Sequence, residues 1–209
     1  MPTDWVEWHD AYASPGSGLG DRLAAVRVQI DRRLDATAPD PVRVVSACAG
    51  DGRDLLGVLA GRSDADRVTA LLVESDMGLA ASAREAAKAL AARVDVRQAD
   101  AAQSDMYAGA VPSDLVLLCG IFGNISDTDV RATVDAAPQL CAPGAEVVWT
   151  RHRNDPDLTP SIRGWFADAG FEEVAFVAPD SDKWSVGVHR LVADPRPLEP
   201  GRLWFTFLR

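Results

Sequence analysis

The sequence predicts an α/β fold in which a doubly wound sheet carries helices on both faces. Short apolar runs rich in β-branched residues alternate along the chain with segments whose apolar residues recur at helical spacing. The first run ends in a turn of small residues, Ala47 to Gly52, which leads directly into a helix. The length of 209 residues suits one domain with one sizeable core.

The composition narrows the class of function. Hydrophobic residues make up 47% of the chain and charged residues 25%, as in an ordinary globular protein. The formal net charge of −10 makes nucleic acid an unlikely main partner, because phosphates attract basic surfaces. No apolar run approaches the ~20 residues that a membrane span needs, and the first residues lack the pattern of a signal peptide. With three cysteines outside metal-ligand spacing, a cytoplasmic protein without a metal site is expected.

Residues 1–40 are expected to form a helical extension of the domain. Trp5, Trp8 and Tyr12 share one face of a short helix, and a break rich in serine and glycine follows. Apolar residues from Leu19 to Leu34 then predict a longer amphipathic helix. The aromatic helix could cover a ligand as a lid, with Tyr12 a candidate substrate contact, or could simply pack on the domain.

The stretch from residue 41 to residue 56 is the centre of the predicted site. The valines of Val42-Arg43-Val44-Val45 favour a buried strand. The small residues that follow would let a ligand lie against backbone N–H groups, in front of a helix N-terminus. The dinucleotide pattern G-x-G-x-x-G fails at Leu55, and no P-loop pattern occurs.

This stretch resembles motif I of the class I S-adenosylmethionine-dependent methyltransferases, in which acid-x-G-x-G-x-G follows an apolar strand. On that alignment Ser46 stands at the acid and Cys48 at the first glycine, so two positions depart from the pattern. Ser46 cannot offer a carboxylate to the ammonium group of the cofactor. Asp51 or Asp54 is therefore expected to supply that charge.

The next two strands end in carboxylates at the places that the family uses. The second strand, Val68 to Glu74, puts Glu74 where an acidic residue can bind both hydroxyls of a ribose. Alternatively, Glu74 only caps the helix that begins near Asp76. The strand from Val94 ends in Ala99-Asp100-Ala101. The resemblance implies that Asp100 accepts from the adenine amino group and that the next N–H meets the ring.

The remaining elements complete the sheet. The fourth strand runs into the loop Ile121 to Ile125, and Ser126 is expected to cap the helix that follows. The turn Pro143-Gly144 is expected to precede the fifth strand, and His189 within the last strand is expected to be structural. The later strands are expected at residues 114–120, 145–150, 171–177 and 184–191, with residues 203–208 an added strand or a packed tail.

The resemblance covers residues 41–192 and implies a seven-stranded sheet of order 3-2-1-4-5-7-6 with strand 7 antiparallel. It divides the chain into a helical extension (1–40), an S-adenosylmethionine-binding methyltransferase domain (41–192) and a C-terminal tail (193–209). The residues expected to bind the cofactor are Ser46, Cys48, Ala49, Gly50, Asp51, Gly52, Asp54, Glu74, Ser75, Asp100, Ala101, Cys119, Gly120 and Ile121.

The resemblance implies transfer of a methyl group from S-adenosylmethionine to a small-molecule acceptor. A non-catalytic S-adenosylmethionine-binding module and a nucleotide-dependent oxidoreductase are the alternatives. An oxygen or nitrogen acceptor would need a base, and His152, just past the fifth strand, is the candidate catalytic residue. Asn124 and Arg151 join Tyr12 as candidate substrate contacts, although an exposed basic loop is the other reading of Arg151.

Overall fold

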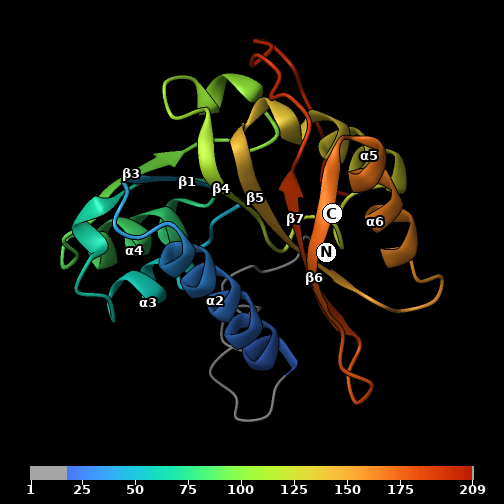
Figure 1. Ribbon diagram of the computed structural model, residues 1–209, viewed down its shortest axis with the longest axis horizontal. Helices are drawn as coiled ribbons and strands as arrows, with labels where there is room; N and C mark the ends of the chain where they lie inside the picture. Colours follow the sequence, from blue (N-terminus) through green and yellow to red (C-terminus); the bar gives the residue numbers. More distant parts are fainter. Residues whose placement is uncertain (1–17, 209) are drawn as a thin grey trace.

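Seven strands form one sheet in the order β3-β2-β1-β4-β5-β7-β6, in a computed structural model that describes residues 18–208 (Figure 1). Strand β7 pairs antiparallel with both of its neighbours, and the other pairs are parallel. The predicted fold class, strand order and antiparallel seventh strand are confirmed. The strands are β1 (Val42–Ala47), β2 (Val68–Glu74), β3 (Arg93–Gln98), β4 (Ser113–Leu118), β5 (Cys141–His152), β6 (Phe171–Val177) and β7 (Trp184–Leu191).

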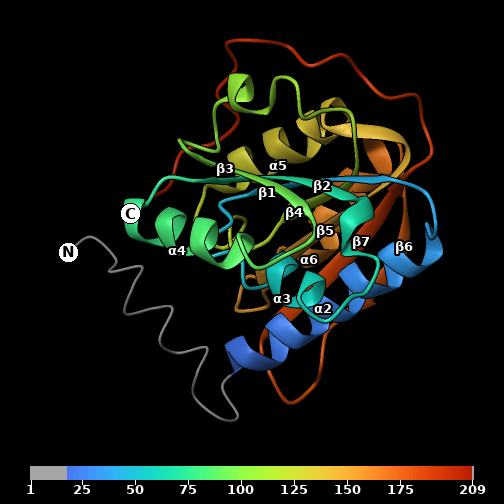
Figure 2. The ribbon, with the colours of Figure 1, turned by 90° about the vertical axis from the view of Figure 1, so that its left-hand side faces the viewer.

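Helices cover both faces of the sheet, as Figure 2 shows for α2 and α3 on one side and α5 on the other. Successive strand residues point to opposite faces, so that Val44 enters the core under α2, α3 and α4, and Val45 enters the core under α5 and α6. The helices are α2 (Gly18–Ala36), α3 (Leu55–Leu59), α4 (Met77–Ala87), α5 (Asp127–Ala136) and α6 (Thr159–Asp168), with short 3₁₀ helices η2 (Ala65–Arg67), η3 (Ser104–Tyr107) and η4 (Ala137–Gln139).

The long N-terminal amphipathic helix is present as α2. Its residues Val26, Ile30 and Leu34 are buried against the sheet, as the helical spacing predicts. The aromatic segment that contains Trp5, Trp8 and Tyr12 lies outside the described residues, so the lid and the role of Tyr12 stay predictions. None of the helices in residues 18–208 has the length and apolar character needed to cross a membrane.

The turn predicted at Pro143-Gly144 is wrong, because both residues lie inside β5. Strand β5 first pairs Cys141 with Ser113, and regular pairing resumes only at Glu146. The residues between form an irregularity in the ladder, where proline loses no ladder hydrogen bond and Gly144 adopts a φ of 72°.

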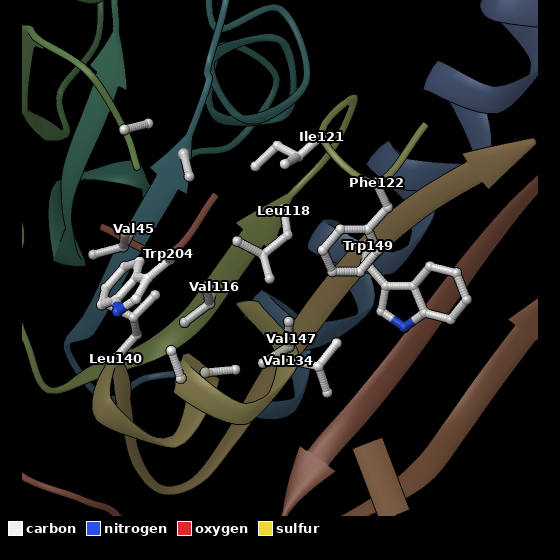
Figure 3. Close-up of a cluster of buried hydrophobic side chains, with 14 of the residues drawn as sticks. Val45, Val116, Leu118, Ile121, Phe122, Val134, Leu140, Val147, Trp149 and Trp204 are labelled. Carbon is white, nitrogen blue, oxygen red and sulfur yellow. The ribbon is translucent and has the colours of Figure 1, made fainter. Parts of the chain in front are cut away.

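The C-terminal segment packs on the α5 side of the sheet as a tail. Its β-pairing with the rest of the described chain is limited to isolated bridges, Gln103 with Leu203 and Ile125 with Phe207, so no added strand forms. The side chain of Trp204 nevertheless enters the core together with Val45 and Leu140 (Figure 3). Residues 203–208 therefore lie against the core without extending the sheet.

Candidate functional site

The turn between β1 and α3 is built from residues in left-handed backbone conformations. The φ angles of Cys48, Gly50 and Gly52 are 51°, 58° and 72°. A Cβ atom at Gly52 would lie 2.7 Å from a methyl carbon of Leu72 and 2.8 Å from one of Leu56. Glycine is therefore required there both for its conformation and for the close packing of the turn on β2 and α3.

Three N–H groups of this turn donate within the protein. Ala49 donates to the carbonyl of Val73 at 3.0 Å, and Gly52 donates to that of Ala49 at 2.9 Å. Gly50 donates to Oε2 of Glu74 at 2.8 Å. All three N–H groups therefore have acceptors within the protein, and their contact with a ligand stays a prediction. The turn also offers a surface of mostly small residues.

Glu74 ends β2 and is held by both neighbouring turns. Its side chain is 7% exposed. Besides the bond from Gly50, its Oε1 accepts from the N–H of Asp76 at 2.8 Å. The cap of α4 is Asp76 itself, which accepts from the N–H of Leu79 at 2.8 Å. Because each carboxylate oxygen can accept two hydrogen bonds, Glu74 keeps acceptor capacity in a fixed orientation.

Asp51 and Asp54 differ in what their carboxylates contact. Asp51 is ion-paired with Arg53, Nη2 to Oδ2 at 2.6 Å. Asp54 is 9% exposed, and its Oδ1 accepts from the N–H of Leu55 at 2.7 Å. Burial raises the pKa of Asp54, which forms no ion pair with any residue between 18 and 208. The charge of Arg27 opposes this rise in pKa but does not cancel it. A buried carboxylate without a direct ion pair is costly, so Asp54 is the residue of the two that a ligand cation would stabilise. Ser46, at the position of the family's acid, is buried within β1.

The loop after β3 brings Asp100 and Ala101 to the same sheet edge. Strand β3 ends at Gln98, and the exposed Asp100 accepts from the N–H of Ala102 at 2.9 Å. The hydroxyl of the buried Tyr107 donates to the carbonyl of Ala101 at 2.6 Å.

Burial, and then the charges of Glu74 and Asp100, raise the pKa of the Cys48 thiol, so the two carboxylates and Cys48 share one environment. Ser75, also expected here, is exposed beside Glu74.

The loop after β4 lies opposite the glycine turn. Strands β1 and β4 pair Ser46 with Leu117, so Cys48 and Cys119, each two residues further on, leave the sheet at the same level. Burial, and then the charge of Asp54, raise the pKa of Cys119. This register agrees with the expectation from the sequence that Cys48 and Cys119 follow neighbouring strands at the same edge of the sheet.

Gly120 anchors the same loop. Its N–H donates to Oγ1 of Thr150 at 2.9 Å, and its carbonyl accepts from the side-chain amide of Asn124 at 2.8 Å. Ile121 is buried beneath the loop. The sequence did not predict that Thr150 would hold Gly120, or that Tyr107 would hold Ala101, by hydrogen bonds. The only signal for Thr150 is that it is a hydroxyl residue at the end of an apolar run.

The end of β5 carries Arg151 and His152. The guanidinium of Arg151 is buried, donates to the carbonyl of Phe122 and lies 3.5 Å from Oδ1 of Asp127. Arg151 is therefore no exposed basic loop residue: it fastens the loop after β4 to β5. Its contact with substrate stays a prediction, as does that of Asn124.

His152 is half-buried and lies against the same loop. A Cβ atom placed on Gly123 would be 3.3 Å from its Cδ2. Burial first, and then the charge of Arg151, lower the pKa of His152, while Asp157 opposes the change. The lowered pKa favours the neutral imidazole, the form that a base requires. No group of three or more histidines, cysteines and acidic residues within residues 18–208 is placed to hold a metal ion.

His189 is held as a structural residue. Its Nδ1 accepts from Nε1 of Trp149 at 3.1 Å, and its ring stacks on Phe166 with centroids 4.5 Å apart. Burial lowers the pKa of His189 to about 4, although Glu173 lies 3.7 Å away. The expectation that His189 is structural fits these contacts.

Comparison with known proteins gives matches in structure alone. No protein-family model matches the chain, and no curated protein matches it in sequence. Magnesium protoporphyrin IX methyltransferase from Synechocystis PCC 6803, solved with S-adenosylmethionine, superposes with a TM-score of 0.70 at 11% identity, over 91% of this chain and 92% of that one. A TehB-like S-adenosylmethionine-dependent methyltransferase from Corynebacterium glutamicum gives 0.61 at 15% identity, over 89% and 95%. A protein assigned as a class I S-adenosylmethionine-dependent methyltransferase from Listeria monocytogenes gives 0.62 at 14% identity, over 86% and 63%. At such identities the likeness is one of fold.

Proposed function

We propose that this chain, whose fold is that of the class I S-adenosylmethionine-dependent methyltransferases, transfers a methyl group from S-adenosylmethionine to a small-molecule acceptor. The observation that carries the proposal is the placement of three carboxylates around a turn of mostly small residues. Asp54 lies at the start of α3, and Glu74 and Asp100 lie at the carboxyl ends of β2 and β3. Open α/β sheets bind ligands at this edge. The solved structures that share the fold and are named as methyltransferases support the same reading.

The residues present fit the parts of S-adenosylmethionine. Asp54, a buried carboxylate that forms no ion pair within residues 18–208, would accept from the ammonium group. Glu74 would accept from the ribose hydroxyls, and Asp100 from the adenine amino group. Cys119 and Gly120 would border the cofactor on the β4 side. When bound, the cofactor supplies an electrophilic methyl group on its sulfonium.

The protein then has to orient the acceptor and exclude water. His152 would take a proton from an oxygen or nitrogen acceptor; its position at the end of β5, beside the loop after β4, and its lowered pKa support this role. Asn124 on that loop and Tyr12 are the candidates that would hydrogen-bond the acceptor.

Ligand-dependent thermal unfolding tests this function against its alternatives. A ligand at 100 times its dissociation constant adds about 2.7 kcal/mol, which raises the Tm of a chain of this size by about 5–10 °C. S-adenosylmethionine and S-adenosylhomocysteine are expected to give this rise, and NAD none. A rise with NAD alone would make the chain an oxidoreductase. Cofactor binding without methyl transfer across a broad screen of acceptors, with labelled methyl donor, would favour a non-catalytic module.

Asp54→Asn is expected to weaken S-adenosylmethionine binding by about 10–100-fold, the range of one charge-assisted hydrogen bond. The same change should raise the Tm of the ligand-free protein, because it removes an unpaired buried carboxylate while asparagine still accepts from the N–H of Leu55. Calorimetry and thermal unfolding measure the two effects.

Asp51→Asn is the matched control, since the carboxylate of Asp51 is ion-paired with Arg53. It should change cofactor affinity by less than about 3-fold, as expected of a pair near the surface. A large loss of cofactor affinity in Asp51→Asn and none in Asp54→Asn would mean that Asp51, and not Asp54, binds the ammonium group.

A further inference from the structure

The C-terminal segment contacts two loops that carry proposed ligand-binding residues. We name residues 201–208 the strap, residues 99–104 the β3 loop and residues 119–126 the β4 loop. We propose that the strap holds both loops in the positions that bind the cofactor, and so acts as a positioning element of the site without touching the ligand. The proposal rests on the proposed function. In Figure 2 the strap is the last part of the red trace, which leads to the label C.

The strap is hydrogen-bonded to the β3 loop through its backbone. The N–H of Ser104 donates to the carbonyl of Arg202 at 2.9 Å, and the N–H of Arg202 donates to Oγ of Ser104 at 2.9 Å. The N–H of Trp204 donates to the carbonyl of Ala102 at 3.0 Å. These bonds begin one residue beyond the Asp100-Ala101 pair that is proposed to meet adenine, so they fix the end of that loop.

Trp204 anchors this part of the strap in the core. Its side chain is 7% exposed, and its ring stacks on Tyr107 with centroids 5.3 Å apart and planes 21° apart. Figure 3 shows the ring among the buried side chains of the sheet, beside Val45. Tyr107 in turn donates to the carbonyl of Ala101, so the strap supports the β3 loop through the ring of Tyr107 as well as through the backbone bonds at the end of the loop.

The far end of the strap is bonded to the β4 loop. The N–H of Leu208 donates to the carbonyl of Asn124 at 3.0 Å, and Phe207 forms a bridge with Ile125. The side-chain amide of Asn124 donates to the carbonyl of Gly120 at 2.8 Å. The strap therefore reaches, through Asn124, the residue that is proposed to border the cofactor.

Between these contacts the strap is fixed by Phe205, which is 3% exposed, and by the N–H of Thr206, which donates to Oδ2 of Asp129 at 3.2 Å. A segment anchored at its middle and bonded to a loop at each end restricts both loops before the ligand arrives. Less ordering entropy is then lost on binding, which strengthens the affinity. The coupling is reciprocal, so a bound ligand must also stabilise the strap.

A chain that ends at Phe205 tests the proposal. It keeps the buried Trp204 and Phe205 and removes the contacts to Asp129, Asn124 and Ile125. Without ligand, backbone amides of the β4 loop should exchange hydrogen about 10-fold faster or more, while those of β4 and β5 stay unchanged. S-adenosylhomocysteine should bind about 5–10-fold more weakly, the loss expected from ordering one loop.

Leu208 provides a point variant and its matched control. The side chain is 66% exposed, so Leu208→Pro removes the N–H donated to Asn124 with little change to the core, whereas Leu208→Ala keeps that N–H. The proline variant should weaken binding as the truncation does, and the alanine variant should bind as the full chain. In the full chain, S-adenosylhomocysteine should slow exchange at the N–H of Leu208.

Two results would overturn the inference. One is unchanged exchange of the β4 loop in the truncated chain, which would mean that the strap does not hold the loop. The other is faster exchange with unchanged S-adenosylhomocysteine affinity, which would mean that the position of the loop does not matter for the ligand. Failure of the proposed function looks different, because the full chain itself would then bind no S-adenosylhomocysteine.

Discussion

Glu74→Ala is expected to weaken S-adenosylmethionine binding by about 30-fold or more, equivalent to about 2 kcal/mol. The change removes the acceptor of the charge-assisted hydrogen bonds that the ribose hydroxyls would donate. It also leaves the N–H groups of Gly50 and Asp76 without their acceptor, so the free energy of unfolding should fall by about 1–3 kcal/mol for each that stays buried. Calorimetry at a temperature where the variant is folded measures the affinity, and denaturant unfolding measures the stability.

Asp76→Ala separates these two effects. It removes the cap of α4, at a cost of about 1 kcal/mol, and leaves the carboxylate of Glu74 in place. Its cofactor affinity should stay close to that of the unchanged chain. Equal losses of cofactor affinity in the two variants would mean that Glu74 holds the neighbouring turns in place and does not bind the ribose. Unchanged affinity in folded Glu74→Ala would reject the ribose assignment directly.

The bounds of several strands could be predicted because each strand is an apolar run closed by turn residues. Strands β2, β6 and β7 begin and end where the sequence pattern indicates. Pro143-Gly144 misled the prediction, since such a pair indicates a turn wherever it occurs. The pairing of Cys141 with Ser113 starts the strand before Pro143-Gly144, and no local pattern contains that pairing.

The site shows the same division between local and long-range information. The cap at Ser126 could be predicted, and its Oγ accepts from the N–H of Asp129 at 3.1 Å. The carboxylate of Asp129, however, accepts from the N–H of Thr206 instead of turning back to the cap. Likewise, the resemblance places Glu74, but the bond from Gly50 that orients it joins residues far apart in the chain.

Arg151 illustrates why the chemistry of the acceptor side is harder to predict than the cofactor side. From the sequence it is one of two arginines that flank a histidine, which suggests an exposed basic loop. In the structure its side chain turns inward to the carbonyl of Phe122, and its charge helps to lower the pKa of His152. Burial and orientation of this kind depend on how β5 packs against the β4 loop, and no local sequence pattern contains that packing.

His152→Gln is expected to reduce turnover by about 100-fold or more while leaving S-adenosylmethionine affinity nearly unchanged, if His152 removes a proton from the acceptor. Glutamine keeps a polar side chain of similar size but cannot accept the proton. Steady-state kinetics with an identified acceptor measures the turnover, and calorimetry of the variant measures the binding.

The pH dependence of turnover identifies the titrating group. Because burial and Arg151 lower the pKa of His152, turnover should persist below pH 6.5, the ordinary pKa of histidine, and fall only as the imidazole gains its proton. Asp157 raises the pKa of His152, so Asp157→Asn should move this fall to still lower pH, while asparagine can still accept from the N–H of Thr159. An unmoved pH profile would show that another group titrates.

A small loss of turnover in His152→Gln would mean that the protein only positions an acceptor that is already nucleophilic. Weakened S-adenosylmethionine binding in that variant would instead place His152 on the cofactor side, because a base that contacts only the acceptor leaves cofactor affinity unchanged.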